Sequence, residues 1–210
     1  LPTIKEKAII KQQVHRYLLW GGFPEVLDAE PALHREILQS YINTVIYRDI
    51  IERYQVKNHV ALRQLLLYCL QNAAGLLSIN KFFKQLKSRG ISVTKDALYQ
   101  YAKYFEDAYC VFSVPVYRFS LNKSESTPKK IYPIDTGLIT AYSIKPGYDK
   151  AALLETAVFL HLRRQHDDIY YYPTPRGKEV DFLTMNPNGQ IALYQASLSL
   201  KDEKTKQREV

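Results

Sequence analysis

The sequence predicts a mixed fold of class α+β / α/β, built from three consecutive parts. Apolar residues recur at helical spacing up to about residue 107, β-branched and aromatic runs begin near residue 109, and one helix followed by three strands is indicated after residue 150. The 210 residues are 46% apolar, which is enough to bury a core in each part. We expect a helical segment at 1–56, a winged-helix domain at 57–135 and an α/β module at 136–210 that ends abruptly, as if truncated.

The first part reads as two amphipathic helices. The pattern at 5–20 is helical, and Gly21-Gly22 ends it. Pro31 opens a second helix whose apolar residues share one wide face as far as Tyr54. We therefore expect this segment to pack as helices, without strands.

The winged-helix prediction rests on the order of elements between residues 58 and 135. Three helical patterns come first; Ser78 is a good N-cap for the second, and Gly90 stops it. The short turn before the third is what a helix-turn-helix requires. Two β-type runs follow, at 109–117 and 130–134, and a β-hairpin after a helix-turn-helix gives the winged-helix arrangement.

Positive charge is concentrated on this second part. The whole chain has 29 Lys and Arg against 21 Asp and Glu, a net charge of +8. Between residues 57 and 103 the only acid is Asp96, against eight basic residues. Basic side chains on a helix-turn-helix are typical of duplex DNA binding. The candidate nucleic-acid-binding residues are Lys81, Lys84, Lys87, Lys95, Tyr99, Gln100 and Lys103. The alternative is a protein-interaction module whose lysines are simply solvated; the absence of Arg on the third helix argues against sequence-specific readout.

Two carboxylates in the third part are candidates for chemistry. Glu155 lies within an apolar helix, and Asp181 lies on a strand between Val180 and Phe182. A carboxylate in such surroundings needs an ion pair, hydrogen bonds or a metal. Glu155 and Asp181 are therefore the candidate catalytic and metal-binding pair, since oxygen ligands suit Mg²⁺ and a bound cation can activate water. The alternative is structural, with Asp181 paired to a neighbour such as Lys178 or Arg176.

The order helix-Glu, strand-Asp, strand resembles the PD-(D/E)xK (restriction-endonuclease-like) nuclease fold, with an αβββα module. That resemblance implies a Glu-x-Lys on the third strand, where this chain has Gln195-Ala196-Ser197. Gln is a poor Mg²⁺ ligand, and Ser cannot supply the positive charge of the lysine. The pattern is half present, so we expect a remnant of a nuclease site without catalysis.

Six short stretches, taken in order along the chain, carry a second resemblance. They are Gly21–Glu25, Tyr47–Ile50, Tyr132–Leu138, Leu154-Glu155, Glu179–Phe182 and Gln207–Glu209. Together they resemble the C-terminal region (domain of unknown function 4143) of bacterial and archaeal AAA-type ATPases. The resemblance implies an ATPase domain as partner, preceding this chain, with ATP and Mg²⁺ as its cofactors. This chain has no GxxxxGK[ST] loop, so we expect no cofactor within it.

The leading functional hypothesis is a non-catalytic nucleic-acid-binding or regulatory region of such an ATPase, with duplex DNA as the expected partner. The alternatives are a metal-dependent DNA nuclease that uses Glu155 and Asp181, and a protein-interaction module. The two cysteines, Cys69 and Cys110, form no CxxC pair and are expected to be reduced core residues of a cytoplasmic protein. No apolar run is long enough to cross a membrane, so no membrane partner is expected.

Overall fold

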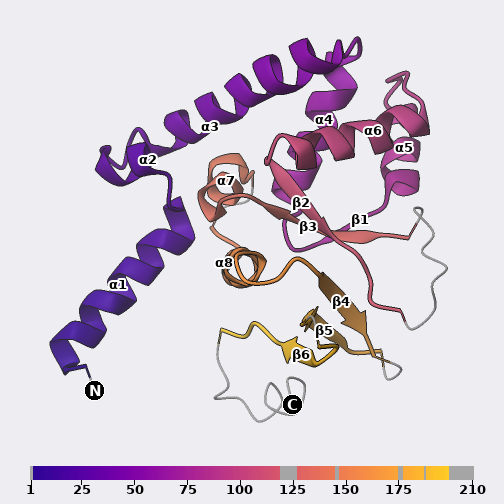
Figure 1. Ribbon diagram of the computed structural model, residues 1–210. Coiled ribbons are helices and arrows are strands. Elements are labelled where there is room, and N and C mark those ends of the chain that lie inside the picture. The colour runs from indigo at the N-terminus through magenta and orange to yellow at the C-terminus, as the bar shows by residue number, and fades with distance from the viewer. Residues whose placement is uncertain (1, 119–126, 145–146, 175–176, 187, 199–210) are drawn as a thin grey trace.

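The computed structural model describes residues 2–118, 127–144, 147–174, 177–186 and 188–198. It confirms the mixed α+β class: helices surround one small antiparallel sheet, and a second antiparallel sheet lies at the other end of the molecule (Figure 1). Within these residues no helix is both long enough and apolar enough to span a bilayer. The helices and strands, in chain order, are α1 (Ile4–Trp20), α2 (Pro24–Asp28), α3 (His34–Thr44), η1 (Val45–Glu52), α4 (His59–Gln71), β1 (Leu76–Leu77), α5 (Ile79–Ser88), α6 (Lys95–Asp107), β2 (Val111–Val114), β3 (Lys129–Pro133), α7 (Thr136–Tyr142), α8 (Lys150–Arg163), β4 (Ile169–Pro173), β5 (Glu179–Met185) and β6 (Ile191–Tyr194).

Side-chain caps determine where most helices begin. The hydroxyl of Ser78 accepts the N–H of Lys81, as expected for the N-cap of α5. The hydroxyl of Thr94 accepts the N–H of Ala97 in the same way at the start of α6. Each such cap satisfies one of the backbone donors that a helix leaves unpaired at its start. The capping residues are Thr3, Asn58, Ser78, Thr94, Asp135 and Asp149.

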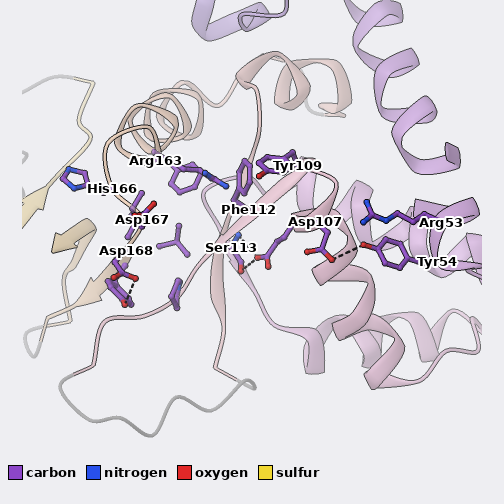
Figure 2. Close-up of a pocket in the computed structure, with 16 residues that line it drawn as sticks. Arg53, Tyr54, Asp107, Tyr109, Phe112, Ser113, Arg163, His166, Asp167 and Asp168 are labelled. Atoms are coloured by element: carbon purple, nitrogen blue, oxygen red, sulfur yellow. Dashed lines mark hydrogen bonds between the residues drawn. The ribbon is translucent and has the colours of Figure 1, made fainter. Parts of the chain in front are cut away.

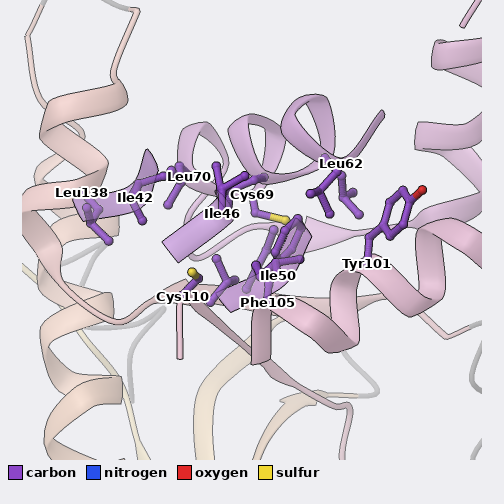
Figure 3. Close-up of a cluster of buried hydrophobic side chains, with 14 of the residues drawn as sticks. Ile42, Ile46, Ile50, Leu62, Cys69, Leu70, Tyr101, Phe105, Cys110 and Leu138 are labelled. Carbon is purple, nitrogen blue, oxygen red and sulfur yellow. The ribbon is translucent and has the colours of Figure 1, made fainter. Parts of the chain in front are cut away.

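The helix after α3 departs from the prediction in its type. η1 is a π-helix, continuous with α3, where the pattern predicted one regular α-helix. Its buried residues include Ile46, Ile50 and Ile51, which pack into the main core together with Leu38 and Ile42 of α3. That core lies among α3 to α7 and contains both cysteines, which are free thiols (Figure 3).

A buried acid joins α1 to α7. The carboxylate of Asp135 accepts the N–H of Gly22 through Oδ2 and the N–H of Gly137 through Oδ1, both at 2.8 Å. Gly21 has φ 79° and ψ −160°, a backbone conformation that is essentially restricted to glycine. A Cβ on Gly21 would overlap the Asp135 carboxylate. Gly21 is therefore required both by the backbone conformation and by this close approach.

The first sheet has the strand order β1-β3-β2, with antiparallel pairing throughout. The second sheet has the order β4-β5-β6, also antiparallel. A parallel bridge between Val116 and Tyr171 links the chain after β2 to β4. A second core lies between the sheets and α8, and the ring of Tyr132 stacks on that of Phe159 at 4.5 Å. β1 was not predicted, and the second helix of the predicted αβββα module, expected from residue 202 onward, lies outside the described residues.

Candidate functional site

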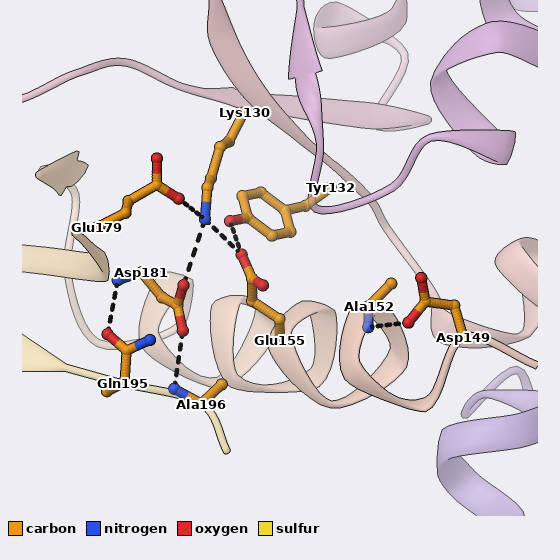
Figure 4. A network of polar contacts seen from close by, with 9 residues as sticks. All are labelled: Lys130, Tyr132, Asp149, Ala152, Glu155, Glu179, Asp181, Gln195 and Ala196. Atoms are coloured by element: carbon orange, nitrogen blue, oxygen red, sulfur yellow. Dashed lines mark hydrogen bonds and ion pairs between the residues drawn. The ribbon is translucent and has the colours of Figure 1, made fainter. Parts of the chain in front are cut away.

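Glu155 and Asp181 lie at one cluster, and both contact a lysine. The Nζ of Lys130, on β3, is 2.8 Å from Oε1 of Glu155 and 3.3 Å from Oδ1 of Asp181. Glu179, two residues before Asp181 on β5, contacts the same Nζ at 2.7 Å. Figure 4 shows the three carboxylates around the ammonium group. We call these four residues the acidic cluster; α8 and β5 contribute the acids, and the first sheet contributes the cation.

The remaining contacts of the acidic cluster hold the two predicted acids in place. The hydroxyl of Tyr132 donates to Oε1 of Glu155 at 2.8 Å. The N–H of Ala196 donates to Oδ2 of Asp181 at 2.9 Å, and the backbone N–H of Asp181 donates to Oε1 of Gln195 at 3.3 Å. Gln195 therefore lies beside Asp181 and accepts a hydrogen bond from its backbone.

Burial and charge act in opposite directions on the acidic cluster. Burial raises the pKa of Glu155, and contact with Lys130 lowers it without cancelling the rise. Burial alone would lower the pKa of Lys130, but the carboxylates of Glu155 and Glu179 raise it above its ordinary value. The side chain of Lys130 is 5% exposed and that of Asp181 is 10% exposed. One ammonium neutralises one of three carboxylates, so the cluster has excess negative charge.

The donor set suits a hard cation, but its arrangement does not form a closed site. Carboxylate oxygens are the ligands that Mg²⁺ prefers, and the ion commonly binds through one or two of them. No group of three or more acids, histidines or cysteines within the described ranges could hold a metal ion. Glu155 and Asp181 are the two residues that could hold Mg²⁺, with the remaining positions left to water or substrate oxygens. In the structure, the ammonium of Lys130 contacts both.

The structural alternative for Asp181 gains a further partner. Asp181 contacts Lys130, which lies 51 residues earlier in the chain and was not considered as a partner in the sequence analysis. Arg176 lies outside the described residues. A lysine in an otherwise apolar β run, Lys130 to Ile134, was the signal available in the sequence, and Lys130, Tyr132 and Glu179 were missed.

The predicted nucleic-acid-binding residues lie on α5 and α6. A groove of about 350 Å³ between α6 and β3 brings together Tyr99, Gln100 and Lys103, and adds Lys129 of β3. Lys95 stands at the start of α6, with its Nζ 5.6 Å from the centre of the Phe83 ring. The other lysines are exposed on α5 and do not line this groove; they are Lys81, Lys84 and Lys87.

A larger cleft, of about 840 Å³, contains none of the predicted residues. It lies between the end of η1, α6, β2 and the α8–β4 connection (Figure 2). The guanidinium of Arg163 lies 3.9 Å from the centre of the Phe112 ring, at the wall of this cleft. Tyr54, also in the wall, donates a hydrogen bond to Asp107. Four acids (Glu106, Asp107, Asp167 and Asp168) and two arginines (Arg53 and Arg163) line the cleft, so its formal charge is net negative and disfavours anions.

Comparison with known proteins identifies relatives without a known activity. A family described as a domain of unknown function (DUF8612) matches residues 11–147. An uncharacterized protein of Methanocaldococcus jannaschii is 31% identical over 209 residues, covering 98% of this chain and 46% of the relative. One of Haemophilus influenzae is 25% identical over 178 residues, covering 85% and 44%. The chain therefore spans about half the length of these relatives. No solved structure gives a significant match.

These findings correct the predicted family. The assignment to domain of unknown function 4143 of AAA-type ATPases is wrong, because the family that matches is a different one. Two stretches that suggested it, Gly21-Gly22 and Asp135–Gly137, contact each other and serve the fold. Glycines and capping residues of this kind answer local backbone requirements, which unrelated proteins share. An ATPase partner domain is therefore no longer inferred.

Proposed function

The chain belongs to the family of domain of unknown function 8612, and we propose that it binds duplex DNA through α5 and α6. One observation carries the proposal: five exposed lysines lie on these two consecutive helices. Lysines neutralise backbone phosphates and release the counterions condensed on the duplex. In this proposal the acidic cluster is structural, because Lys130 pairs with its acids. The five are Lys81, Lys84, Lys87, Lys95 and Lys103.

The topology supports a winged-helix arrangement for this proposal. The elements α4, β1, α5, α6, β2 and β3 follow one another, and the strands are ordered β1-β3-β2. In a helix-turn-helix, the second helix enters the major groove. Here that helix is α6, whose Tyr99, Gln100 and Lys103 share a groove with Lys129. We infer that α6 and β3 contact the duplex together.

Titration of a fluorescent DNA duplex at several salt concentrations tests this function. The double substitution Lys95→Ala and Lys103→Ala is expected to reduce the slope of log affinity against log salt by about two, because two phosphate contacts are removed. The matched control is Lys7→Ala with Lys11→Ala, which removes the same charge from exposed positions on α1. Equal effects from both pairs of substitutions would mean that binding depends on the net charge of the protein and not on the position of the lysines. Absence of binding at low salt would reject the proposal and favour a protein-interaction module.

A second candidate function is metal-dependent hydrolysis of DNA, and one observation favours it. The acidic cluster holds three carboxylates against one ammonium. A divalent cation at Glu155 and Asp181 would offset the excess negative charge and polarise a phosphate. The order α8, β4, β5, β6 is compatible with the PD-(D/E)xK module, although Gln195 and Ser197 stand in place of its Glu and Lys.

Incubation of supercoiled plasmid with the protein and Mg²⁺ or Mn²⁺ tests the second candidate. We expect Asp181→Asn and Glu155→Gln each to abolish nicking if these residues hold the ion. Asn186→Asp, in the turn that follows β5, is the control and should leave nicking unchanged. Cleavage that persists in Asp181→Asn would reject this site. No cleavage by the wild type with either ion would reject this second candidate.

A further inference from the structure

Lys130 is an unusual position for a lysine. The residue is 4% exposed, and burying an ammonium group is costly unless it is paired. Its carboxylate partners lie on α8 and β5, whereas Lys130 itself lies on β3 of the other sheet. Tyr132, two residues further along β3, contacts the same oxygen of Glu155. β3 thus directs two hydrogen-bond donors at the acids that would hold a metal.

We propose that Lys130 is the positively charged catalytic group of the candidate nuclease centre, in place of the lysine that the nuclease pattern has at position 197. This inference rests on the second candidate function. Its Nζ contacts both Glu155 and Asp181, so the charge faces the two residues that define the site. The cation therefore comes from a different strand and a different sheet, which explains how Ser197 can stand at the usual position without loss of the charge.

The role assigned to Lys130 is electrostatic. In hydrolysis, the oxygen of a water molecule bonds to phosphorus while the bond from phosphorus to the leaving oxygen breaks. The water loses one proton and the leaving oxygen gains one, so the products are a phosphomonoester and an alcohol. Negative charge on the phosphoryl oxygens is stabilised by a fixed positive group in a site that excludes most water. Lys130 has the burial and the charge for that task.

The position of β3 also connects the acidic cluster to the groove on α6. Lys129 lines that groove and is exposed, whereas its neighbour Lys130 is buried in the acidic cluster. Successive side chains on a strand point to opposite faces, so one strand presents a lysine to each site. A duplex held at Lys129 would lie against the strand that carries the proposed catalytic lysine.

A set of three variants tests this assignment. Lys130→Met alone would leave the acids uncompensated, so the test uses Lys130→Met with Glu179→Gln, which keeps the formal charge of the cluster unchanged. Glu179→Gln alone is the matched control, because Glu179 is the most exposed of the three acids. The third variant adds Ser197→Lys to the double variant and returns a lysine to the position in the motif. Circular dichroism during heating checks the fold of each variant.

Two readouts are needed, plasmid nicking with Mn²⁺ and Mn²⁺ binding by titration calorimetry without DNA. We expect the double variant to nick about 100-fold more slowly than Glu179→Gln, which is the usual loss when one charge-stabilising group is removed. Its affinity for Mn²⁺ should be equal or higher, since a competing cation is gone. Adding Ser197→Lys should increase nicking at least about tenfold over the double variant. If only the triple variant folds, its nicking is compared with that of Glu179→Gln.

The possible outcomes test the role of Lys130 separately from the nuclease activity itself. Equal nicking by the double variant and Glu179→Gln overturns the role of Lys130 but keeps the nuclease. A double variant that has lost Mn²⁺ binding together with nicking also overturns it, because the lysine would then only support the metal site. A folded triple variant without nicking contradicts the replacement of position 197. No nicking by the wild type rejects both the nuclease and its lysine.

Discussion

Replacement of Gly21 by alanine tests the junction between α1 and α7. Gly21 has φ 79° and ψ −160°, and its missing Cβ leaves the space that the Asp135 carboxylate occupies. Gly21→Ala therefore imposes strain on the backbone and also displaces a buried acid from its donors. Both effects weaken the folded state, and neither removes any apolar surface.

The size of the effect follows from the two contributions. An alanine in this region of φ and ψ costs on the order of 1–3 kcal/mol. The carboxylate of Asp135 accepts the N–H groups of Gly22 and Gly137, both at 2.8 Å, and hydrogen bonds to a charged group contribute about 1.5–3 kcal/mol each. If the Asp135 side chain keeps one of its two hydrogen bonds, we expect Gly21→Ala to lower the free energy of unfolding by about 4 kcal/mol.

Urea unfolding measures this effect, with Trp20 as the probe. Trp20 is the single tryptophan and adjoins Gly21, so its fluorescence reports on the junction, and far-UV circular dichroism reports on the helices. Gly90→Ala is the matched control: Gly90 also has positive φ, at 75°, but a Cβ there meets nothing within 4 Å. We expect it to cost about 1 kcal/mol. Equal losses for Gly21→Ala and Gly90→Ala would refute the clash with Asp135.

Three further predictions concern an acid, two thiols and a cap. Burial raises the pKa of Asp135 above its ordinary value of 3.8, and the N–H groups of Gly22 and Gly137 offset this only in part. Between the pKa of the unfolded chain and that of the folded protein, the folded state keeps a proton that the unfolded chain has released. Wild-type stability therefore falls as the pH rises through this range. Asp135→Asn does not titrate at this position, so its destabilisation in urea should be larger at pH 4 than at pH 7. Burial raises the pKa of Cys69 and of Cys110 to about 12, so iodoacetamide at pH 8 should label both about 10³-fold more slowly than a free cysteine, as followed by intact mass. Thr94→Ala should cost about 1 kcal/mol in urea unfolding, because the N-cap of α6 is lost.

Each of these has a contrary result. A larger effect of Asp135→Asn at pH 7 than at pH 4 would mean that the folded state favours the charged acid. Rapid labelling of either thiol without urea would mean that the core opens readily, and full labelling in urea is the control. Thr94→Ser keeps the hydroxyl and should retain most of the stability; a loss as large as that of alanine would contradict the cap.

The sequence was most informative where spacing and local chemistry agree. Ser78 caps the helix that it was predicted to begin, and the β-type runs after residue 109 lie at β2 and β3. Glu155 and Asp181 were recognised because an isolated carboxylate in apolar surroundings needs a partner. These signals are local, so they survive without knowledge of the tertiary structure.

Contacts between segments that are distant in the sequence could not be predicted from such local patterns. Lys130 lies 25 residues before Glu155 and 51 before Asp181, and only the packing of β3 against α8 brings them together. The identity of the family was also misjudged, because short glycine and capping motifs carry little family information. The two-residue strand β1 is too short to give a periodic signal.

The π-helical turns of η1 limit how this region can change in length. Buried Leu38, Ile42, Ile46 and Ile50 recur at intervals of four, whereas an α-helix drifts by about 40° with each such step. The wider turns of η1 accommodate this spacing. Deleting one residue between 45 and 52 would turn everything after it by up to about 100°, the rotation per residue of an α-helix. Point substitutions are therefore tolerable on the outer face of η1, but insertions and deletions are not, and relatives of this protein should differ here in composition and not in length.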